Sequence, residues 1–191
     1  MSVPFTYHRH FVDNPEVAFE RLQRELDWKR VREVRSEYYC NDFPDPYTYG
    51  SGRGRMAYDP QPWHSVILEI RKKLEKLVGK TFEVCFLNRY LSFKDHLGWH
   101  SDDSPEMDDA RPIVTISLGA EREIWFRAKD KPETVTKLLL ENGSCCIMHP
   151  GMQETHQHRI PKADHPCGER ISLTFRGYLI NPTPEKQEQL R

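Results

Sequence analysis

Apolar residues in the second half of the chain fall into short runs that are separated by residues typical of turns. Short strands at this spacing predict an antiparallel sandwich or barrel, because alternating strand and helix units would need helical segments between the runs. Asn142-Gly143 predicts a tight hairpin between two of the runs. We therefore expect a two-sheet jelly roll over about residues 81–180, with strands in FEVCFLNRYL, IVTISLG, REIWFRA, TVTKLLL, SCCIMHP and RISLTFRGYLI.

Two segments in the first half have apolar residues at helical spacing instead. The first begins at the sequence DNPE, residues 13–16, where a capping side chain, a proline and an acidic residue are typical of a helix start. It is expected to run to about Trp28, and a second helix follows Pro62 and ends at Gly79. Each helix should pack on a sheet through an apolar stripe, formed by Val17, Leu22 and Leu26 in the first and by Val66, Ile67, Ile70, Leu74 and Leu77 in the second.

The segment between the helices, about residues 35–63, is rich in tyrosine, proline, glycine and arginine. This composition predicts a loop or irregular hairpin region. Tyrosine rings can stack on bases and arginines can meet phosphates, so the segment is a candidate nucleic-acid contact. A surface flap whose tyrosines only cover the core has the same composition. The residues in question are Tyr38, Tyr39, Tyr47, Tyr49, Tyr58, Arg53 and Arg55.

Length and charge narrow the function classes only slightly. A chain of 191 residues is expected to form one domain with a sizeable core. Its net charge is −1, so a nucleic-acid partner would have to be held by a local basic patch. Five cysteines without a CxxC pair indicate reduced thiols. No segment is apolar for long enough to be a signal peptide or a membrane span, and we expect a soluble protein of the cytoplasm, or of the nucleus in a eukaryote.

A candidate metal site lies in the sequence NRYLSFKDHLGWHSDD, residues 88–103. In an extended strand residues two apart share a face, so His100 and Asp102 place an imidazole and a carboxylate side by side. Iron(II) oxygenases bind the metal through two histidines and one carboxylate on one face. A second histidine is therefore needed downstream, and the spacing leaves His156 and His158 open as candidates.

The last apolar run, residues 170–176, alternates strictly between polar and apolar residues. Arg170 and Arg176 lie on the polar face, roughly 20 Å apart along a strand, and side chains that lean toward each other leave room for a five-carbon diacid. Two guanidinium groups suit two carboxylates. An edge strand with ordinary surface arginines is the alternative.

In order along the chain, NRY, HSD, a distal histidine and RISLTFR resemble the AlkB family of iron- and 2-oxoglutarate-dependent dioxygenases. RSEYY, PYTYGSG and DPQPW resemble the nucleotide-recognition lid of the family's nucleic-acid repair members. The resemblance covers about residues 35–178. It implies an α+β fold in one dioxygenase domain, 1–191, with a double-stranded β-helix (jelly roll) core at about 81–180, N-terminal helices packed on it and an aromatic lid at about 35–63.

The resemblance implies roles for individual residues. It favours His158 over His156, because His158 occupies the family's position before the segment RIPK. Ser172 replaces the family's usual asparagine, and Ser104 stands where many repair members have an acidic residue, so that Asp103 is expected to take over that contact. The implied iron ligands are His100, Asp102 and His158; the implied 2-oxoglutarate contacts are Asn88, Tyr90, Arg170, Ser172 and Arg176; and the implied substrate contacts are Tyr47, Tyr49, Arg53, Arg55 and Asp103.

The activity implied by the resemblance is oxidative demethylation of alkylated bases, with Fe(2+) and 2-oxoglutarate as cofactors. The expected substrates are 1-methyladenine and 3-methylcytosine in single- or double-stranded DNA, with RNA as a further candidate. A monomer without a membrane partner is expected. An AlkB-like oxygenase that modifies a protein or a small molecule is the alternative, and a binding module without enzymatic activity would leave the paired arginines unexplained.

Overall fold

The computed structural model describes residues 3–31, 33–49 and 56–179, apart from the side chain of Tyr49. A seven-stranded sheet, here the major sheet, has the strand order β1-β11-β8-β13-β6-β3-β2, and a four-stranded minor sheet has the order β10-β9-β12-β7. The pairings within both sheets are antiparallel. The elements are β1 Phe5–His8, α1 Pro15–Glu25, β2 Lys29–Val31, β3 Arg35–Asn41, β4 Tyr47–Tyr49, β5 Met56–Tyr58, α2 Ser65–Val78, β6 Val84–Tyr90, β7 Leu97–His100, β8 Ile113–Gly119, β9 Arg122–Ala128, β10 Val135–Leu140, β11 Ser144–Met148, α3 Met152–Thr155, β12 His156–Ile160 and β13 Arg170–Arg176.

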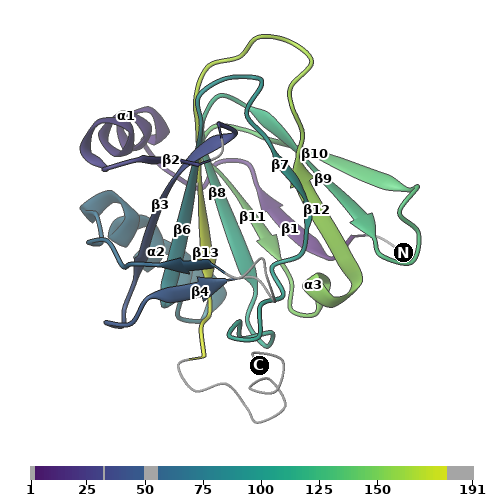
Figure 1. The fold of residues 1–191 in the computed structure, drawn as a ribbon, viewed down its shortest axis with the longest axis horizontal. Coiled ribbons are helices and arrows are strands. Elements are labelled where there is room, and N and C mark those ends of the chain that lie inside the picture. The colour runs from purple at the N-terminus through teal and green to yellow at the C-terminus, as the bar shows by residue number, and fades with distance from the viewer. Residues whose placement is uncertain (1–2, 32, 50–55, 180–191) are drawn as a thin grey trace.

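Figure 1 shows the two sheets facing each other, with α1 and α2 together at the side of the major sheet that faces away from the minor sheet. This arrangement confirms the jelly-roll core and the helices packed on it. One apolar cluster joins both helices to the major sheet, and a second fills part of the space between the sheets. In the described part of the chain, no helix is long and apolar enough to cross a membrane.

The helix predictions are confirmed in position but not in every stripe residue. Pro15 lies in the first turn of α1, yet no side chain caps the helix at Asn14. Gly79 ends α2 in the left-handed conformation, with φ of 69°. Val17 and Leu77 point to solvent, with 56% and 47% of their surface exposed. The apolar stripes are therefore narrower than spacing alone predicted.

The loop prediction for residues 35–63 is wrong for residues 35–41, which form β3 inside the major sheet. The polar residues of this strand concealed it in the sequence. Arg35 donates hydrogen bonds to both Glu37 and Asn88 on the face directed at the minor sheet. Only the later part of the segment forms a separate hairpin, β4 and β5.

The turn at Asn142-Gly143 is present, but it is not a hairpin. Gly143 has φ of 78°, and the Ser144 amide donates to the Glu141 carbonyl. The strands on either side, β10 and β11, belong to different sheets. The turn residues thus identify a tight reversal, whereas the pairing of each strand is decided by distant partners.

Candidate metal and anion site

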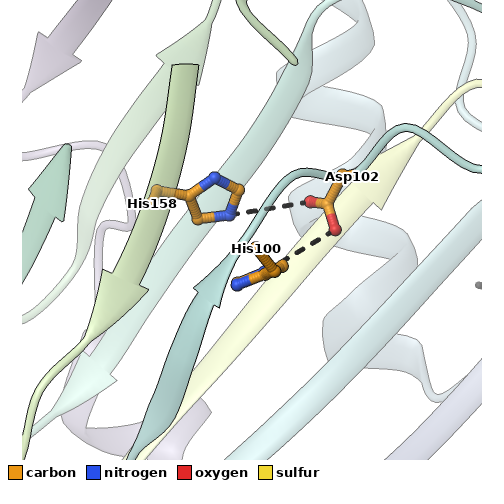
Figure 2. A group of neighbouring side chains, drawn as sticks. All are labelled: His100, Asp102 and His158. Atoms are coloured by element: carbon orange, nitrogen blue, oxygen red, sulfur yellow. Dashed lines mark ion pairs between the residues drawn. The ribbon is translucent and has the colours of Figure 1, made fainter. Parts of the chain in front are cut away.

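Three candidate metal ligands converge between the two sheets. β7 and β12 pair antiparallel with His100 directly opposite His158, and Asp102 follows two residues after His100. One donor atom from each of the three side chains lies within 4.8 Å of the other two (Figure 2). The His-x-Asp pair and the downstream histidine, 56 residues later by number, are therefore neighbours because of strand register.

The donor atoms face one another without hydrogen-bonding one another. Asp102 Oδ1 lies 3.8 Å from His100 Nε2, and Asp102 Oδ2 lies 3.9 Å from His158 Nε2. Burial, together with the neighbouring His100, lowers the pKa of His158 to about 3. The His158 ring is therefore neutral at physiological pH, and the neutral ring is the form that binds a metal.

Other groups hold these ligands in place. His100 Nδ1 lies 2.9 Å from the Gly98 carbonyl, which directs Nε2 toward Asp102. Gln153 Oε1, from α3, accepts a hydrogen bond from the Asp102 amide at 2.9 Å. Sequence reasoning missed Gln153, since nothing in a glutamine 51 positions away indicates a contact with Asp102.

The polar face of β13 lies opposite this cluster, on the major sheet. β13 pairs with β8 on one side and β6 on the other, so it is a central strand and the edge-strand alternative is wrong. Its apolar residues, Ile171, Leu173 and Phe175, lie in the cluster shared with the helices. Its polar residues, Arg170, Ser172, Thr174 and Arg176, are all buried on the other face.

Arg170 is a fully buried cation with unfilled hydrogen-bonding capacity. Its exposed fraction is 0%, and its Nε donates to Ser117 Oγ at 2.9 Å. Neither Nη1 nor Nη2 has a hydrogen-bond partner in the described part of the chain. Burial lowers the pKa of Arg170 to about 10. A buried guanidinium with two unused donors is costly unless an anion accepts from them.

Arg176, at the other end of β13, contacts the candidate metal ligands instead. Its Nη2 donates to Asp102 Oδ1 at 2.8 Å, and its Nη1 donates to the Tyr47 hydroxyl at 3.2 Å. The two arginines of the strand therefore differ: Arg176 binds a carboxylate of the protein, whereas Arg170 has capacity for an external one.

The remaining expected cofactor contacts lie on the same inner face of the major sheet. Tyr90 pairs with Arg170 across β6 and β13, and its ring centre is 5.2 Å from the Arg170 guanidinium carbon. Asn88 pairs with Ser172 in the next row, with its side-chain oxygen accepting from Arg35 Nε at 2.8 Å. Asn88 therefore lies beside the middle of β13, nearer Arg170 than Arg176.

His156 lies outside the cluster. It precedes His158 by two residues on β12, and its Nδ1 lies 2.8 Å from Thr155 Oγ1. Its partner in the register is Ala128, whereas that of His158 is Phe126 on β9 and His100 on β7. Between the two histidines that spacing left open, the structure thus places only His158 beside His100 and Asp102.

The expected substrate contacts are only partly within the described residues. Arg53 and Arg55 lie outside them, as does the side chain of Tyr49. Tyr47 is fully buried against Tyr39, with ring centres 4.8 Å apart, so the expected contact of Tyr47 with the substrate does not fit its position. Asp103 is exposed beside Lys129 Nζ, at 3.4 Å.

Comparisons with known proteins agree with this geometry. The family model described as 2OG-Fe(II) oxygenase superfamily matches residues 2–176. Alpha-ketoglutarate-dependent dioxygenase alkB homolog 3 of Bos taurus is 33% identical over 190 residues, which cover 90% of this chain and 65% of that protein. DNA oxidative demethylase ALKBH2 of Mus musculus is 31% identical over 169 residues, which cover 85% of this chain and 68% of the relative. The solved structure of OsALKBH1 has a TM-score of 0.65 at 18% identity and covers 93% of this chain and 98% of that one, which shows a shared fold.

Proposed function

We propose that this chain, which belongs to the 2OG-Fe(II) oxygenase superfamily and, within it, to the AlkB family, removes methyl groups oxidatively from alkylated nucleobases. The proposed substrates are 1-methyladenine and 3-methylcytosine in DNA, with RNA as a further candidate. The match spans 65% of the length of the cattle relative, and the names of two relatives, a dioxygenase and a DNA oxidative demethylase, support the proposal.

The side chains present fit an iron(II) ion. Two imidazoles and one carboxylate, the set typical of non-haem iron oxygenases, offer donor atoms within 4.8 Å of one another. His158 and Asp102 are buried and His100 is partly exposed. In the proposal, His100, Asp102 and His158 hold the iron, and Gln153 and Arg176 fix the orientation of Asp102.

The single observation that carries the proposal is the buried guanidinium of Arg170. Its two unused Nη groups match the two oxygens of a carboxylate, and a bidentate contact of this kind is charge-assisted. In the proposal, Arg170 binds the carboxylate of 2-oxoglutarate that lies away from the metal, with Tyr90 beside it. Ser172, Asn88 and Arg176 line the path from there toward Asp102 along the inner face of the sheet.

When bound, iron and 2-oxoglutarate would supply the oxidative chemistry, with dioxygen as the oxidant. This chemistry hydroxylates the N-methyl group, which then leaves as formaldehyde. The residues of the chain position the reactants and exclude water. A methyl group on the pairing edge is hidden in a duplex, so the base must be extruded or single-stranded, and alkylation makes extrusion easier because it weakens pairing.

In the proposal, the lid hairpin contacts the extruded base and its phosphates. The rings of Tyr39, Tyr47 and Tyr58 pack together with Phe86 under β4 and β5. This packing attaches the hairpin to the major sheet. Tyr49 is proposed to stack on the base, Arg53 and Arg55 to meet phosphates, and Asp103 to contact the target base. If Tyr49 stacks, Tyr49→Ala should lose about 1–3 kcal/mol of oligonucleotide binding and Tyr49→Phe should keep most of it.

The test is incubation of the purified protein with Fe(II), 2-oxoglutarate and oligonucleotides that carry one methylated base. Mass spectrometry should show loss of one CH2 unit from the methylated oligonucleotide and no change in the unmethylated one. Reactions without 2-oxoglutarate, and reactions with His158→Ala, serve as controls. Consumption of 2-oxoglutarate that leaves every oligonucleotide unchanged would reject this proposal and favour a protein or small-molecule substrate.

A further inference from the structure

The outer face of the minor sheet carries a group of aromatic and basic side chains, here called the outer strip: Trp99, Trp125, Arg127, Lys137 and Arg159. His100 and His158 point between the sheets, so their neighbours Trp99 and Arg159 point to the opposite face. Arg159 is opposite Trp125 in the β12–β9 register, and Trp125 is opposite Lys137 in the β9–β10 register. The outer strip therefore runs across all strands of the minor sheet.

The side chains of the outer strip stack as alternating cations and rings. The Arg159 guanidinium carbon lies 4.2 Å from the Trp125 ring centre and 4.8 Å from that of Trp99. Lys137 Nζ lies 4.3 Å from the Trp125 ring centre, and Arg127 lies 4.2 Å from that of Trp99. Stacking on a ring holds a cation in one orientation without neutralising it.

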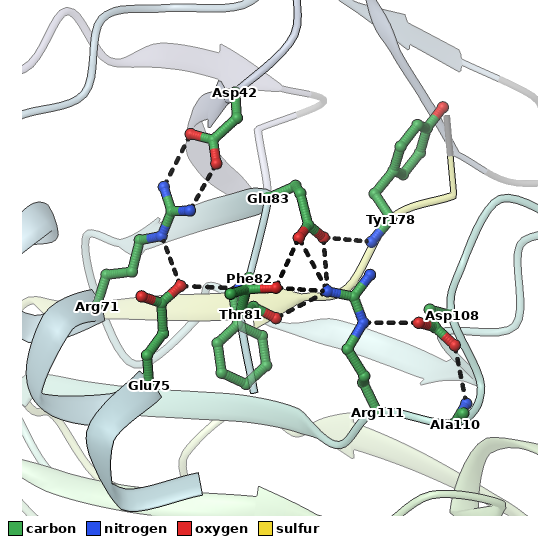
Figure 3. A network of polar contacts seen from close by, with 10 residues as sticks. All are labelled: Asp42, Arg71, Glu75, Thr81, Phe82, Glu83, Asp108, Ala110, Arg111 and Tyr178. Atoms are coloured by element: carbon green, nitrogen blue, oxygen red, sulfur yellow. Dashed lines mark hydrogen bonds and ion pairs between the residues drawn. The ribbon is translucent and has the colours of Figure 1, made fainter. Parts of the chain in front are cut away.

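Charge pairing separates these cations from several other arginines of the protein. Arg71 and Arg111 each bind two carboxylates, those of Asp42 and Glu75 and those of Glu83 and Asp108 (Figure 3). Arg30 and Arg89 also have carboxylate partners. By contrast, among the described residues no carboxylate forms an ion pair with a cation of the outer strip, and Arg127 donates instead to the neutral Gln157 Oε1 at 2.6 and 3.0 Å.

A set of fixed, unneutralised cations on a solvent-facing sheet matches an extended polyanion. The net charge of the whole chain is −1, so this attraction is local. The outer strip begins at Trp99, next to the proposed ligand His100. Lys129 follows Trp125 and Arg127 at the same two-residue spacing, and its Nζ forms an ion pair with Asp103. On the β10 side Glu123 accepts a hydrogen bond from the Trp125 indole at 2.7 Å, and Glu121, Glu123 and Asp164 line a cavity of about 490 Å³ together with Trp125 and Lys137. These acids would repel a polyanion and so limit the track.

We propose that the outer strip binds the sugar-phosphate backbone of a single strand next to the target base, an inference that rests on the proposed nucleic-acid substrate. The strand leaves the active site near Asp103, passes the β7 edge and crosses the outer face. Phosphate contacts of this kind position a strand without specifying sequence. The outer strip therefore adds affinity for long single strands and leaves the choice of methylated base unchanged.

The test compares Arg127→Gln/Lys137→Gln with the control Lys72→Gln/Lys76→Gln, which removes two charges from exposed lysines of α2 on the other side of the molecule (Figure 1). Binding of unmethylated oligothymidylates of about 5 and about 20 nucleotides, one shorter and one longer than most single-strand sites, is measured by fluorescence anisotropy over a range of salt concentrations. The loss of two phosphate contacts should reduce the slope of log K against log salt concentration for the longer probe by about 1.4, or about 0.7 for each contact. At about 0.15 M salt this corresponds to a roughly tenfold loss of affinity. The short probe, and the control variant with either probe, should bind as with wild type.

The inference is overturned if the strip variant binds the longer probe as tightly as the control, or if it loses both probes equally. A glutamate-rich peptide of matched charge serves as a competitor. If it competes as well as the longer oligonucleotide does, the inference is overturned and the outer strip binds an acidic protein instead. Binding does not require turnover, so the two proposals can fail separately. If the strip variant loses affinity only for the longer probe and the wild type removes no methyl group, the outer strip is sustained and the demethylase activity is rejected. If the double variant does not fold, Lys137→Gln alone changes an exposed side chain and should give half the change in slope.

Discussion

The two sheets of the sandwich face the same site but differ in what covers their other faces. Every residue of β13 in the major sheet is buried, because the helices cover the back of that sheet. In β9 of the minor sheet, buried residues alternate with partly exposed ones. Alternation therefore means different things in the two sheets: in the major sheet it separates apolar core from buried polar groups, and in the minor sheet it separates interior from solvent.

This difference divides the chemistry of the site. The minor sheet provides His100 and His158, and a shell of Trp and Arg residues on its outer side. The major sheet provides Arg170 and Arg176, whose charges are enclosed. A cation buried this way must find an anion, whereas a cation on the outer face of the minor sheet remains in contact with water. Substitutions on either side of the site test this division.

Loss of a ligand on the minor-sheet side should abolish turnover. His100→Ala, Asp102→Ala and His158→Ala each remove one of three donors, so the iron is poorly held. Formaldehyde release and iron content of the purified variants are the measurements. His156→Ala, on the same strand as His158 but outside the cluster, is the matched control and should be mild. An inactive His156→Ala together with an active His158→Ala would assign the second histidine ligand to position 156.

Arg170→Leu should raise the 2-oxoglutarate concentration needed for half-maximal turnover at least tenfold, since a charge-assisted contact contributes roughly 1.5–3 kcal/mol. The same change should not lower the stability of the ligand-free protein, because it removes a buried charge with two unused donors. Thermal melting with and without 2-oxoglutarate separates the two effects: only the wild type should gain stability from the ligand. Equal gains would place the diacid elsewhere.

Gln153→Leu should weaken metal binding by about 10–100-fold, the usual effect of losing a group that orients a metal ligand. The substitution removes the acceptor of the Asp102 amide without touching a donor atom of the cluster. Titration with Mn(II), followed by calorimetry, measures this directly. Gln157→Leu, which changes a glutamine on the outer face, is the control and should leave metal affinity unchanged. Similar affinities for both variants would remove Gln153 from this role.

Tyr47→Phe should have the smallest effect, about 1 kcal/mol in the free energy of unfolding. It removes a buried hydroxyl that accepts from Arg176 at 3.2 Å, a long contact, and keeps the ring that packs on Tyr39. Urea denaturation with an unchanged m-value is the measurement. Tyr58→Phe removes a tyrosine hydroxyl from the same aromatic cluster, one that contacts Met56 sulfur at 3.6 Å, and provides the baseline. A Tyr47→Phe protein as stable as that baseline would show that this hydrogen bond contributes nothing.

Local patterns were sufficient to predict much of the fold. The two-residue period of 170–176 separates Ile171 and Leu173 from the arginines correctly, because side chains of a strand alternate whatever its neighbours are. The helix ends also follow from local groups, as Gly79 shows. Sequence did not reveal that β13 is central, since its two partners, β6 and β8, begin 86 and 57 positions earlier.

The site required information that pattern alone does not contain. Spacing could not separate His156 from His158, and the register of β12 against β7 does so. The buried strand β3 reads as a loop because Arg35 and Glu37 neutralise each other inside the protein. The outer strip did have a signal in the segment REIWFRA, where Glu123, Trp125 and Arg127 alternate with apolar residues, but its partners come from other strands.

The central position of β13 also has a consequence for the order of folding. The ribosome releases the chain from its N-terminus, and β13 is the last strand of the sheet to emerge although β6 and β8 meet only through it. Until Arg170–Arg176 is inserted, the two halves of the major sheet have no common strand. Long-range pairing of this kind makes the final step slow. Because the strand that completes the sheet also carries Arg170, the arginine proposed to bind 2-oxoglutarate, the sheet and the proposed anion site are completed in the same folding step.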